Sequence, residues 1–211
     1  MQNRNTPLTE SDIAGLDWAK LNGLLPAIVQ DRSTQQVLML AYMNEEALRE
    51  TLSSGRTVFY SRSRQELWRK GETSGARLGR PVVYADCDND TLLVFADPVG
   101  PACHLGDVSC FMSDVAPGVG WIAQLEKIID QRAVEGGEGS YVRNLMDAGI
   151  PRMAQKVGEE AVETALAAAL DNETELRDEA ADLLFHLTVL LRAKGVSTSD
   201  IVDVLRARHG D

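Results

Sequence analysis

Residues 116–129 read APGVGWIAQLEKII, and the chain changes character inside this stretch. The proline and the two glycines before Trp121 are typical of a linker, because both residue types interrupt regular structure. From Trp121 onward apolar residues recur at helical spacing, at Leu125, Ile128 and Ile129. We therefore expect two domains, residues 1–114 and residues 115–211.

The first domain is predicted to be a strand-rich α+β domain. Short runs rich in β-branched and aromatic residues occur at 26–31, 35–43, 57–61, 81–88 and 91–100. One helix interrupts them. Asn44 is a suitable N-cap, Glu45 and Glu46 favour the first turn through the helix dipole, and Gly55 ends the helix.

The second domain is predicted to be all-α. Further helices are expected at 140–148, 151–170, 173–193 and 199–209, and Asn172 with Glu175 suits the start of the third of these. An apolar stripe on that helix favours packing as a helical bundle, and it consists of Leu176, Ala180, Leu183, Leu187 and Leu190.

Composition excludes several classes of function. The chain has 211 residues and a formal net charge of -11, which argues against binding nucleic acid through a basic face. Its apolar runs fall short of the ~20 residues that a membrane span needs. The first twelve residues contain no apolar segment typical of a secretory signal, so we expect a soluble, cytoplasmic protein.

Residues 86–90, DCDND, follow a strand-like run and form the first candidate metal site. In an extended segment alternate side chains share a face, so Asp86, Asp88 and Asp90 would point to one side and Cys87 to the other. Carboxylates suit Mg²⁺ and thiolates suit Zn²⁺. The segment can therefore serve two metals.

Cys87 has two potential partners within 24 residues, Cys103 and Cys110. Three protein ligands would leave the fourth tetrahedral position of zinc open for water, as in catalytic zinc sites. His104 is adjacent to Cys103, and it is either a fourth ligand or a general acid/base. The alternative is that the cysteines are ordinary buried residues.

Residues 61–75, SRSRQELWRKGETSG, combine basic side chains, hydroxyls and glycines. This combination favours phosphate binding, although a solvated surface hairpin has the same composition. The candidate substrate contacts in this stretch are Arg62, Arg64, Trp68, Lys70, Glu72 and Ser74.

The helical half contains a second candidate metal site. Glu160 and Glu163 lie three residues apart on one expected helix, and Glu179 and Asp182 repeat the spacing on the next. Two packed helices can place these four carboxylates around Mg²⁺ ions. The alternative is a hydrated acidic face.

A polyphosphate bound at such a site can be hydrolysed by water, with a carboxylate accepting the proton. Glu163 is the candidate for this catalytic role, and Lys156 and Arg152, one and two turns upstream of Glu160, are candidate phosphate contacts. His186 is interpreted as a bundle residue, and His209 as a solvated one.

Taken together, these motifs resemble a known bifunctional family of histidine biosynthesis. The segments LMLAYMN, TVFYSRSRQELWRKGETSG, DCDND and GPACHLGDVSCF resemble phosphoribosyl-AMP cyclohydrolase. The segments SYVRNLMDAG, KVGEEAVETALA, EAADLLFHL and LRARHG resemble phosphoribosyl-ATP pyrophosphatase. The E-x-x-E and E-x-x-D pair is also shared with MazG-like pyrophosphohydrolases, which implies a MazG-like helical bundle.

The resemblance implies a set of ligands and roles. Cys87, Cys103 and Cys110 would bind zinc, His104 would be the catalytic histidine, and the aspartates of DCDND would bind magnesium. In the family the zinc site takes cysteines from both subunits, which implies a homodimer.

The implied reactions are hydrolysis of phosphoribosyl-ATP to phosphoribosyl-AMP and pyrophosphate in the second half, and hydrolytic opening of the adenine ring at N1–C6 in the first. The product would be the formimino-carboxamide ribotide. One alternative is a housecleaning nucleoside-triphosphate pyrophosphohydrolase fused to an unrelated zinc module. Another is a structural zinc domain that binds nucleic acid, which the excess of acidic residues in the first half disfavours.

Overall fold

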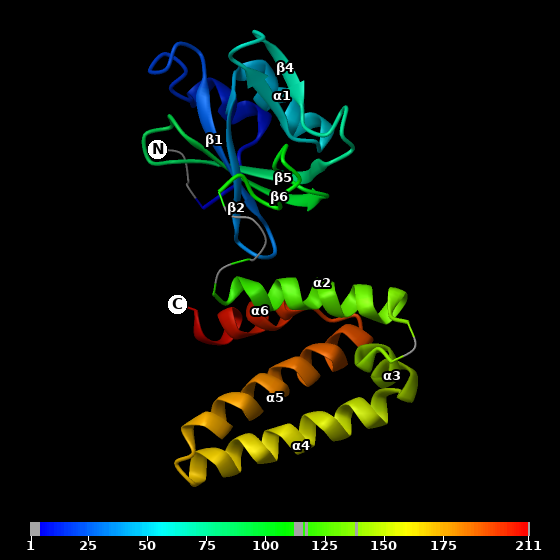
Figure 1. Ribbon diagram of the computed structural model, residues 1–211. Coiled ribbons are helices and arrows are strands. Elements are labelled where there is room, and N and C mark those ends of the chain that lie inside the picture. Colours follow the sequence, from blue (N-terminus) through cyan, green and yellow to red (C-terminus); the bar gives the residue numbers. More distant parts are fainter. Residues whose placement is uncertain (1–4, 112–115, 117, 138, 211) are drawn as a thin grey trace. The chain divides into compact units, whose positions relative to one another are not determined.

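The computed structural model describes residues 5–111, 116, 118–137 and 139–210. It divides the chain into two compact units, Met1–Gly120 and Trp121–Asp211. The domain boundary expected between residues 114 and 115 lies outside the described residues. Figure 1 shows the strands before this region of the chain and helices α2 to α6 after it, as the sequence predicts.

The N-terminal unit is built on a four-stranded sheet with the order β2-β1-β6-β5. Its strands are β1 (Leu25–Asp31), β2 (Val37–Met43), β5 (Arg77–Ala85) and β6 (Leu92–Val99). β1 pairs antiparallel with β2 and parallel with β6, and β5 pairs antiparallel with β6. The register between β5 and β6 shifts between Gly79 and Val82. Pro81, which cannot donate a hydrogen bond, falls within this irregularity.

One face of the sheet carries the core. Residues alternate along β1, so that Leu25, Ala27 and Val29 are fully buried while the side chains between them are only half-buried. The helix α1 (Glu45–Ser54) packs against β2, β3 and β5. Asn44 caps it by accepting a hydrogen bond from the backbone N–H of Ala47, and Gly55 ends it in the left-handed conformation, as predicted.

One element was not expected from the sequence, and residues 61–75 include part of the hairpin that was the alternative interpretation of that stretch. A 3₁₀ helix, η1 (Glu10–Gly15), begins with a reciprocal hydrogen-bonded cap between Thr9 and Asp12. The 61–75 stretch is only partly a loop, because β3 (Val58–Ser61) and β4 (Glu66–Arg69) pair as an antiparallel hairpin. Phe59 on β3 is fully buried and its ring packs against that of Trp68 on β4, which anchors the hairpin to the core.

The second unit is all-helical, with α2 (Gly120–Glu135), α3 (Tyr141–Ala148), α4 (Ile150–Ala169), α5 (Glu173–Ala193) and α6 (Thr198–His209). Figure 1 shows α4 and α5 running antiparallel side by side. The bounds of α5 are those predicted, and Asn172 caps it through the N–H of Glu175. None of the helices among the described residues has the length and apolar character needed to cross a membrane.

The core of this unit is small. It consists of Ile129, Val142, Leu145, Met153 and Val189. The stripe expected to be the packing face of α5 is only partly buried, and Leu187 within it is 37% exposed. The buried positions of α5 are His186, Thr188 and Val189, because α5 turns that side toward α3 and α4. His186 is a buried bundle residue and His209 is exposed, as expected.

Candidate active sites

The three aspartates of DCDND lie in a turn that follows β5. The strand ends at Ala85, and the Asp86 carboxylate accepts hydrogen bonds from the backbone N–H groups of Asp90 (3.0 Å) and Thr91 (3.1 Å). The expectation of an extended segment is therefore wrong, because the Asp86 side chain captures backbone donors and closes the turn.

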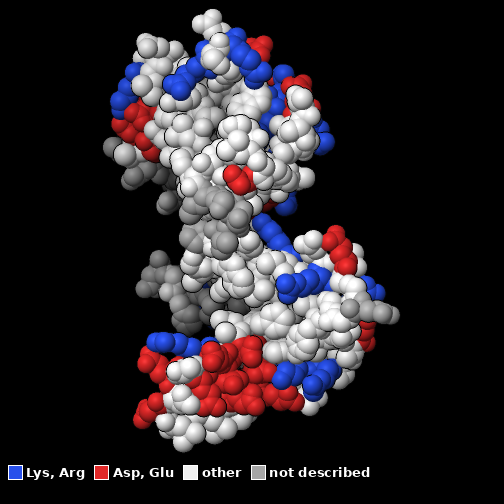
Figure 2. Space-filling model, in the orientation of Figure 1, with Lys and Arg blue, Asp and Glu red and all other residues white. Residues whose placement is uncertain are grey.

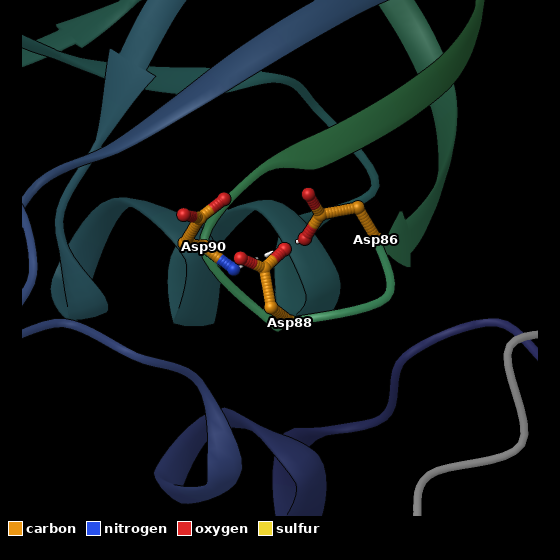
Figure 3. Close-up of side chains that lie close together, drawn as sticks. All are labelled: Asp86, Asp88 and Asp90. Atoms are coloured by element: carbon orange, nitrogen blue, oxygen red, sulfur yellow. Dashed lines mark hydrogen bonds between the residues drawn. The ribbon is translucent and has the colours of Figure 1, made fainter.

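The turn nevertheless gathers the carboxylates. One oxygen from each of Asp86, Asp88 and Asp90 lies within 4.8 Å of the others, and Figure 3 shows the three side chains converging. Asn89 adopts φ 61° at the bend. Three convergent hard oxygen ligands on one short turn fit Mg²⁺.

Sequence reasoning missed Lys20, which lies beside these aspartates. Its ammonium nitrogen is 2.7 Å from Asp88 Oδ2 and also forms an ion pair with Asp90. The hydrogen bonds from Lys20 lower the pKa of both the Asp88 and the Asp90 carboxyls. No local pattern indicates this pairing, because Lys20 lies far from the aspartates in sequence.

Two of the three cysteines are neighbours. Cys103 is buried and Cys110 is exposed, and the pKa of the Cys110 thiol is raised by burial of its sulfur and by the nearby Cys103. Two adjacent thiols suit a cation that can compensate both of their thiolates, as zinc does. Cys87 is exposed on the aspartate turn. Among the described residues of one chain, no group of three convergent ligands includes a cysteine.

A cavity of about 380 Å³ joins Cys103 and His104 to the 61–75 stretch. Four of the predicted substrate contacts are among its lining residues, namely Trp68, Lys70, Glu72 and Ser74. The Lys70 ammonium donates to the carbonyl of Ala102 (2.6 Å), which holds the hairpin against the segment that contains Cys103. The cavity can therefore hold a ligand against both the thiols and the exposed His104.

A second cavity, of about 590 Å³, lies on the other part of the hairpin and shares Trp68. Arg62 lines it, with its guanidinium 3.8 Å from the centre of the Tyr42 ring. Tyr42 and Tyr60 were not identified from the sequence. Arg64 lines neither cavity and is paired with Glu66 at 3.3 Å.

In the helical unit, three of the four predicted carboxylates converge. Oxygens of Glu160 on α4 and of Glu179 and Asp182 on α5 lie within 4.8 Å of one another. Glu160 is 3% exposed. Glu163 is exposed and is not part of this group, although its charge acts on Glu179. Figure 2 shows a broad field of acidic residues on the helical unit.

The carboxyls of this group differ in acidity. The hydrogen bond from Lys156 lowers the pKa of Glu160, whereas burial and the negative charge of Glu163 raise the pKa of Glu179. Glu160 lies close to Glu179 and further raises the pKa of the Glu179 carboxyl, as expected for neighbouring acidic groups. Convergent oxygen ligands that repel in this way fit a divalent cation.

The two predicted phosphate contacts are engaged with glutamates. Lys156 forms ion pairs with Glu160 and, at 3.0 Å, with Glu159. Arg152 lies 3.7 Å from Glu159. Lys156 is thus next to the convergent carboxylates, whereas Arg152 contacts only Glu159, which lies outside that group.

Comparisons with known proteins agree with this two-part arrangement. Residues 39–112 match the family model for phosphoribosyl-AMP cyclohydrolase, and residues 122–209 match the model for phosphoribosyl-ATP pyrophosphohydrolase. The histidine biosynthesis bifunctional protein HisIE of Xylella fastidiosa strain Temecula1 is 54% identical over 97% of this chain and 98% of its own length. The chain belongs to the HisIE family.

Other HisIE proteins are similarly close. The protein of Escherichia coli K12 is 50% identical over 96% of this chain and 99% of its own length, and that of Campylobacter jejuni is 52% identical over 91% and 93%. As a HisIE protein, the chain is a bifunctional enzyme of histidine biosynthesis, with the cyclohydrolase in the N-terminal unit and the pyrophosphohydrolase in the helical unit.

Proposed function

We propose that the helical unit hydrolyses phosphoribosyl-ATP to phosphoribosyl-AMP and pyrophosphate, and that the N-terminal unit opens the adenine ring of phosphoribosyl-AMP at N1–C6 to give the formimino-carboxamide ribotide. The observation that carries this assignment is the cavity that places Trp68, Lys70, Glu72 and Ser74 against Cys103 and His104. Its size suits a nucleotide, and its lining combines an aromatic face with a cation and hydroxyl groups.

In the ring-opening reaction, water adds to C6 of the purine and the N1–C6 bond breaks. Zinc held by Cys103, Cys110 and Cys87 would supply an activated water, because zinc lowers the pKa of water that it binds. His104 is exposed in the same cavity, and it transfers the proton that the departing N1 requires. Trp68 packs against the base, and Lys70 and Arg62 bind phosphate oxygens. Magnesium is assigned to Asp86, Asp88 and Asp90.

Direct measurement tests the sequence of steps. Purified protein supplied with phosphoribosyl-ATP and Mg²⁺ is expected to release pyrophosphate and then to show the ultraviolet change of ring opening. Pyrophosphate without ring opening would contradict the assignment of the N-terminal cavity. Hydrolysis of ordinary deoxynucleoside triphosphates at the same rate would favour the housecleaning alternative.

We assign the zinc site to two subunits of a homodimer, with Cys87 supplied by one chain and Cys103 and Cys110 by the other. The separation of Cys87 from the other two thiols within one chain supports this arrangement. So does the open face of the sheet, where Ile28, Tyr84, Leu93 and Phe95 line an apolar cavity that reaches Asp86 in the cysteine-bearing turn. A second copy of the chain is the occupant that would complete the zinc site.

Mixing two inactive variants tests the shared site. Cys87→Ser and Cys103→Ser each lose ring opening, but a mixed dimer contains one site with all three cysteines, so unfolding and refolding the two together is expected to restore part of the activity. The control pair is Cys103→Ser with Cys110→Ser, which cannot complement because both residues come from the same chain. Equal failure of both pairs would place the zinc site within one chain.

For the helical unit, we propose that Glu160, Glu179 and Asp182 hold Mg²⁺, that Glu163 contacts a further ion or accepts the proton of the attacking water, and that Arg152 and Lys156 bind the phosphates. Mg²⁺ would neutralise the developing charge on the leaving pyrophosphate. Lys156 is held next to Glu160, and the hydrogen bonds that its ammonium donates to Glu160 and Glu159 raise its pKa, so it remains a cation. The exposed position of Glu163 near Glu179 supports its separate role.

Substitution of Glu163 separates the two activities. We expect Glu163→Gln to abolish pyrophosphate release while the variant still opens the ring of supplied phosphoribosyl-AMP. Glu173→Gln, which changes another exposed glutamate that is paired with Arg177 on its own helix, is the matched control and is expected to retain both activities. Loss of both activities in folded Glu163→Gln would contradict independent sites.

The cytoplasm is the proposed location. Cys87, Cys103 and Cys110 are all free thiols, and zinc ligation requires them to remain reduced. Cell fractionation is expected to find the ring-opening activity with cytoplasmic markers, and recovery with extracytoplasmic fractions would contradict this location.

A further inference from the structure

A buried histidine connects the carboxylate group of the helical unit to a tyrosine on a different helix. His186 on α5 is 5% exposed. Its Nδ1 lies 2.8 Å from the backbone carbonyl of Asp182, and its Nε2 lies 2.8 Å from the hydroxyl of Tyr141 on α3. Because a carbonyl only accepts, Nδ1 carries the hydrogen, and in the neutral ring Nε2 accepts from the tyrosine. The chain of hydrogen bonds thus runs from Tyr141 through His186 to Asp182.

The same imidazole touches a second carboxylate residue. His186 Nδ1 is 3.7 Å from Oε1 of Glu160, which is itself buried on α4. Glu160 and Asp182 belong to the convergent group that includes Glu179. His186 therefore contacts the side chain of one proposed metal ligand, Glu160 on α4, and the backbone of another, Asp182 on α5.

Ring packing fixes the imidazole in this orientation. Phe185 and Tyr141 both meet it nearly edge-on, with centroids at 5.2 Å and 5.8 Å and interplanar angles of 79° and 81°. Tyr141 also stacks on Phe185 at 6.2 Å. The ring contacts and the two hydrogen bonds hold the His186 imidazole beside the Glu160 carboxylate.

We propose that Tyr141 and His186 are positioning residues of the helical unit, which hold Glu160 and the Asp182 turn of α5 in the arrangement that binds a divalent cation. This inference rests on the proposed metal site. Neither residue contacts the ion. Their contribution is to keep the buried carboxylate of α4 and the carboxylates of α5 converged before the ion arrives, so that binding does not have to order them.

Metal binding to the full chain, measured without substrate, tests the proposal. Mn²⁺ is the probe, and electron paramagnetic resonance measures the free Mn²⁺ during the titration. The Mn²⁺-binding sites that Glu160→Gln loses are assigned to the helical unit. Tyr141→Phe keeps all three rings and removes one hydrogen bond, and we expect it to weaken that class about 10-fold, the lower range for residues that support metal ligands. His186→Leu removes both hydrogen bonds, and it is expected to weaken the site further.

Two controls separate positioning from general stability. Thr188→Val removes a buried hydroxyl group of α5 that donates a hydrogen bond to the Leu184 carbonyl (2.7 Å). This variant is expected to leave Mn²⁺ affinity unchanged. His186→Gln can again bond to the Tyr141 hydroxyl, and it is expected to recover part of the affinity lost in His186→Leu. In Tyr141→Phe, saturating Mg²⁺ is expected to restore pyrophosphate release.

The outcomes are distinguishable. If Glu160→Gln leaves Mn²⁺ binding intact, the proposed metal site itself fails. If Glu160→Gln removes one class of site while Tyr141→Phe and His186→Leu bind Mn²⁺ as the parent does, the metal site stands and the positioning role is wrong. Equal losses of affinity in Tyr141→Phe and Thr188→Val would also overturn it, because the effect would then be one of stability alone.

Discussion

Lys20 is the clearest case of a single side chain that changes the chemistry of a site. Asp86, Asp88 and Asp90 lie close enough to repel one another, and the ammonium of Lys20 is paired with two of them. A lysine in this position occupies the place of a counter-ion, so it stabilises the metal-free turn and competes with a cation that approaches the same oxygens.

We expect Lys20→Met to lower the thermal stability of the metal-free protein and to increase the stabilisation that Mg²⁺ produces. The pairing lowers the pKa of Asp88 and Asp90, so its stabilising effect is present above their ordinary value of 3.8 and is lost as the pH falls through the lowered values. Thermal unfolding in chelator and in Mg²⁺ measures both effects. An unchanged response to Mg²⁺ would indicate that Lys20 and the ion do not compete.

Glu179 gives the helical site a different dependence on pH. Burial and the charge of Glu163 raise the pKa of Glu179 above its ordinary value of 4.5, so a metal must displace its proton. Metal affinity at this site is expected to rise with pH until the raised pKa is passed and then to level off. Glu163→Gln removes one cause of the raised pKa of Glu179, so the rise in metal affinity is expected to move to lower pH. Mn²⁺ titrations across the acidic range measure it, and identical profiles for the parent and Glu163→Gln would contradict this coupling.

At the scale of elements, the ends of helices could be predicted wherever a single cap residue determines them. Helix α1 begins after Asn44 and ends at Gly55, and Asn172 caps the start of α5. These ends could be predicted because helix caps depend on hydrogen bonds within a few residues. The 86–90 turn was not predicted, because a strand pattern does not indicate that the Asp86 side chain will take the backbone donors. The contacts of Lys20 and of Tyr141 join distant parts of the chain, which no local pattern contains.

The end of α1 provides a test of this local control. Gly55 has φ 69°, and a Cβ added there would meet no atom within 4 Å, so only backbone conformation penalises Gly55→Ala. We expect a loss of about 1 kcal/mol in the free energy of unfolding. Gly15→Ala also has open space but no positive φ, and it is the control. Chemical denaturation measures both variants, and equal effects would show that backbone conformation is not the cause.

At the scale of the whole molecule, the two units each contain a separate set of candidate residues. The fold class of each could be predicted from hydrophobic periodicity, and the carboxylate group from helical spacing. Assembly could not be predicted in the same way, since the open sheet face and exposed α4 and α5 residues such as Val162, Leu166 and Leu184 become visible only once the chain is folded. Of these surfaces, the sheet face is the one proposed above to contact a second copy.

Independence of the units has a measurable consequence. Cys103→Ser is expected to lose zinc and ring opening, while pyrophosphate is released from phosphoribosyl-ATP at the parent rate and phosphoribosyl-AMP accumulates. Metal analysis and chromatography of the products check both statements. Retention of zinc and ring opening in this variant would remove Cys103 from the site.

Trp68 belongs to the walls of both cavities in the N-terminal unit. A molecule that filled both spaces would have Trp68 between a phosphate-bearing arm beside Arg62 and a second arm beside His104. Phosphoribosyl-AMP has such a two-armed shape, whereas a simple mononucleotide has only one arm. Because one side chain borders both cavities, we expect Trp68→Ala to weaken the binding of a two-armed ligand more than that of a mononucleotide.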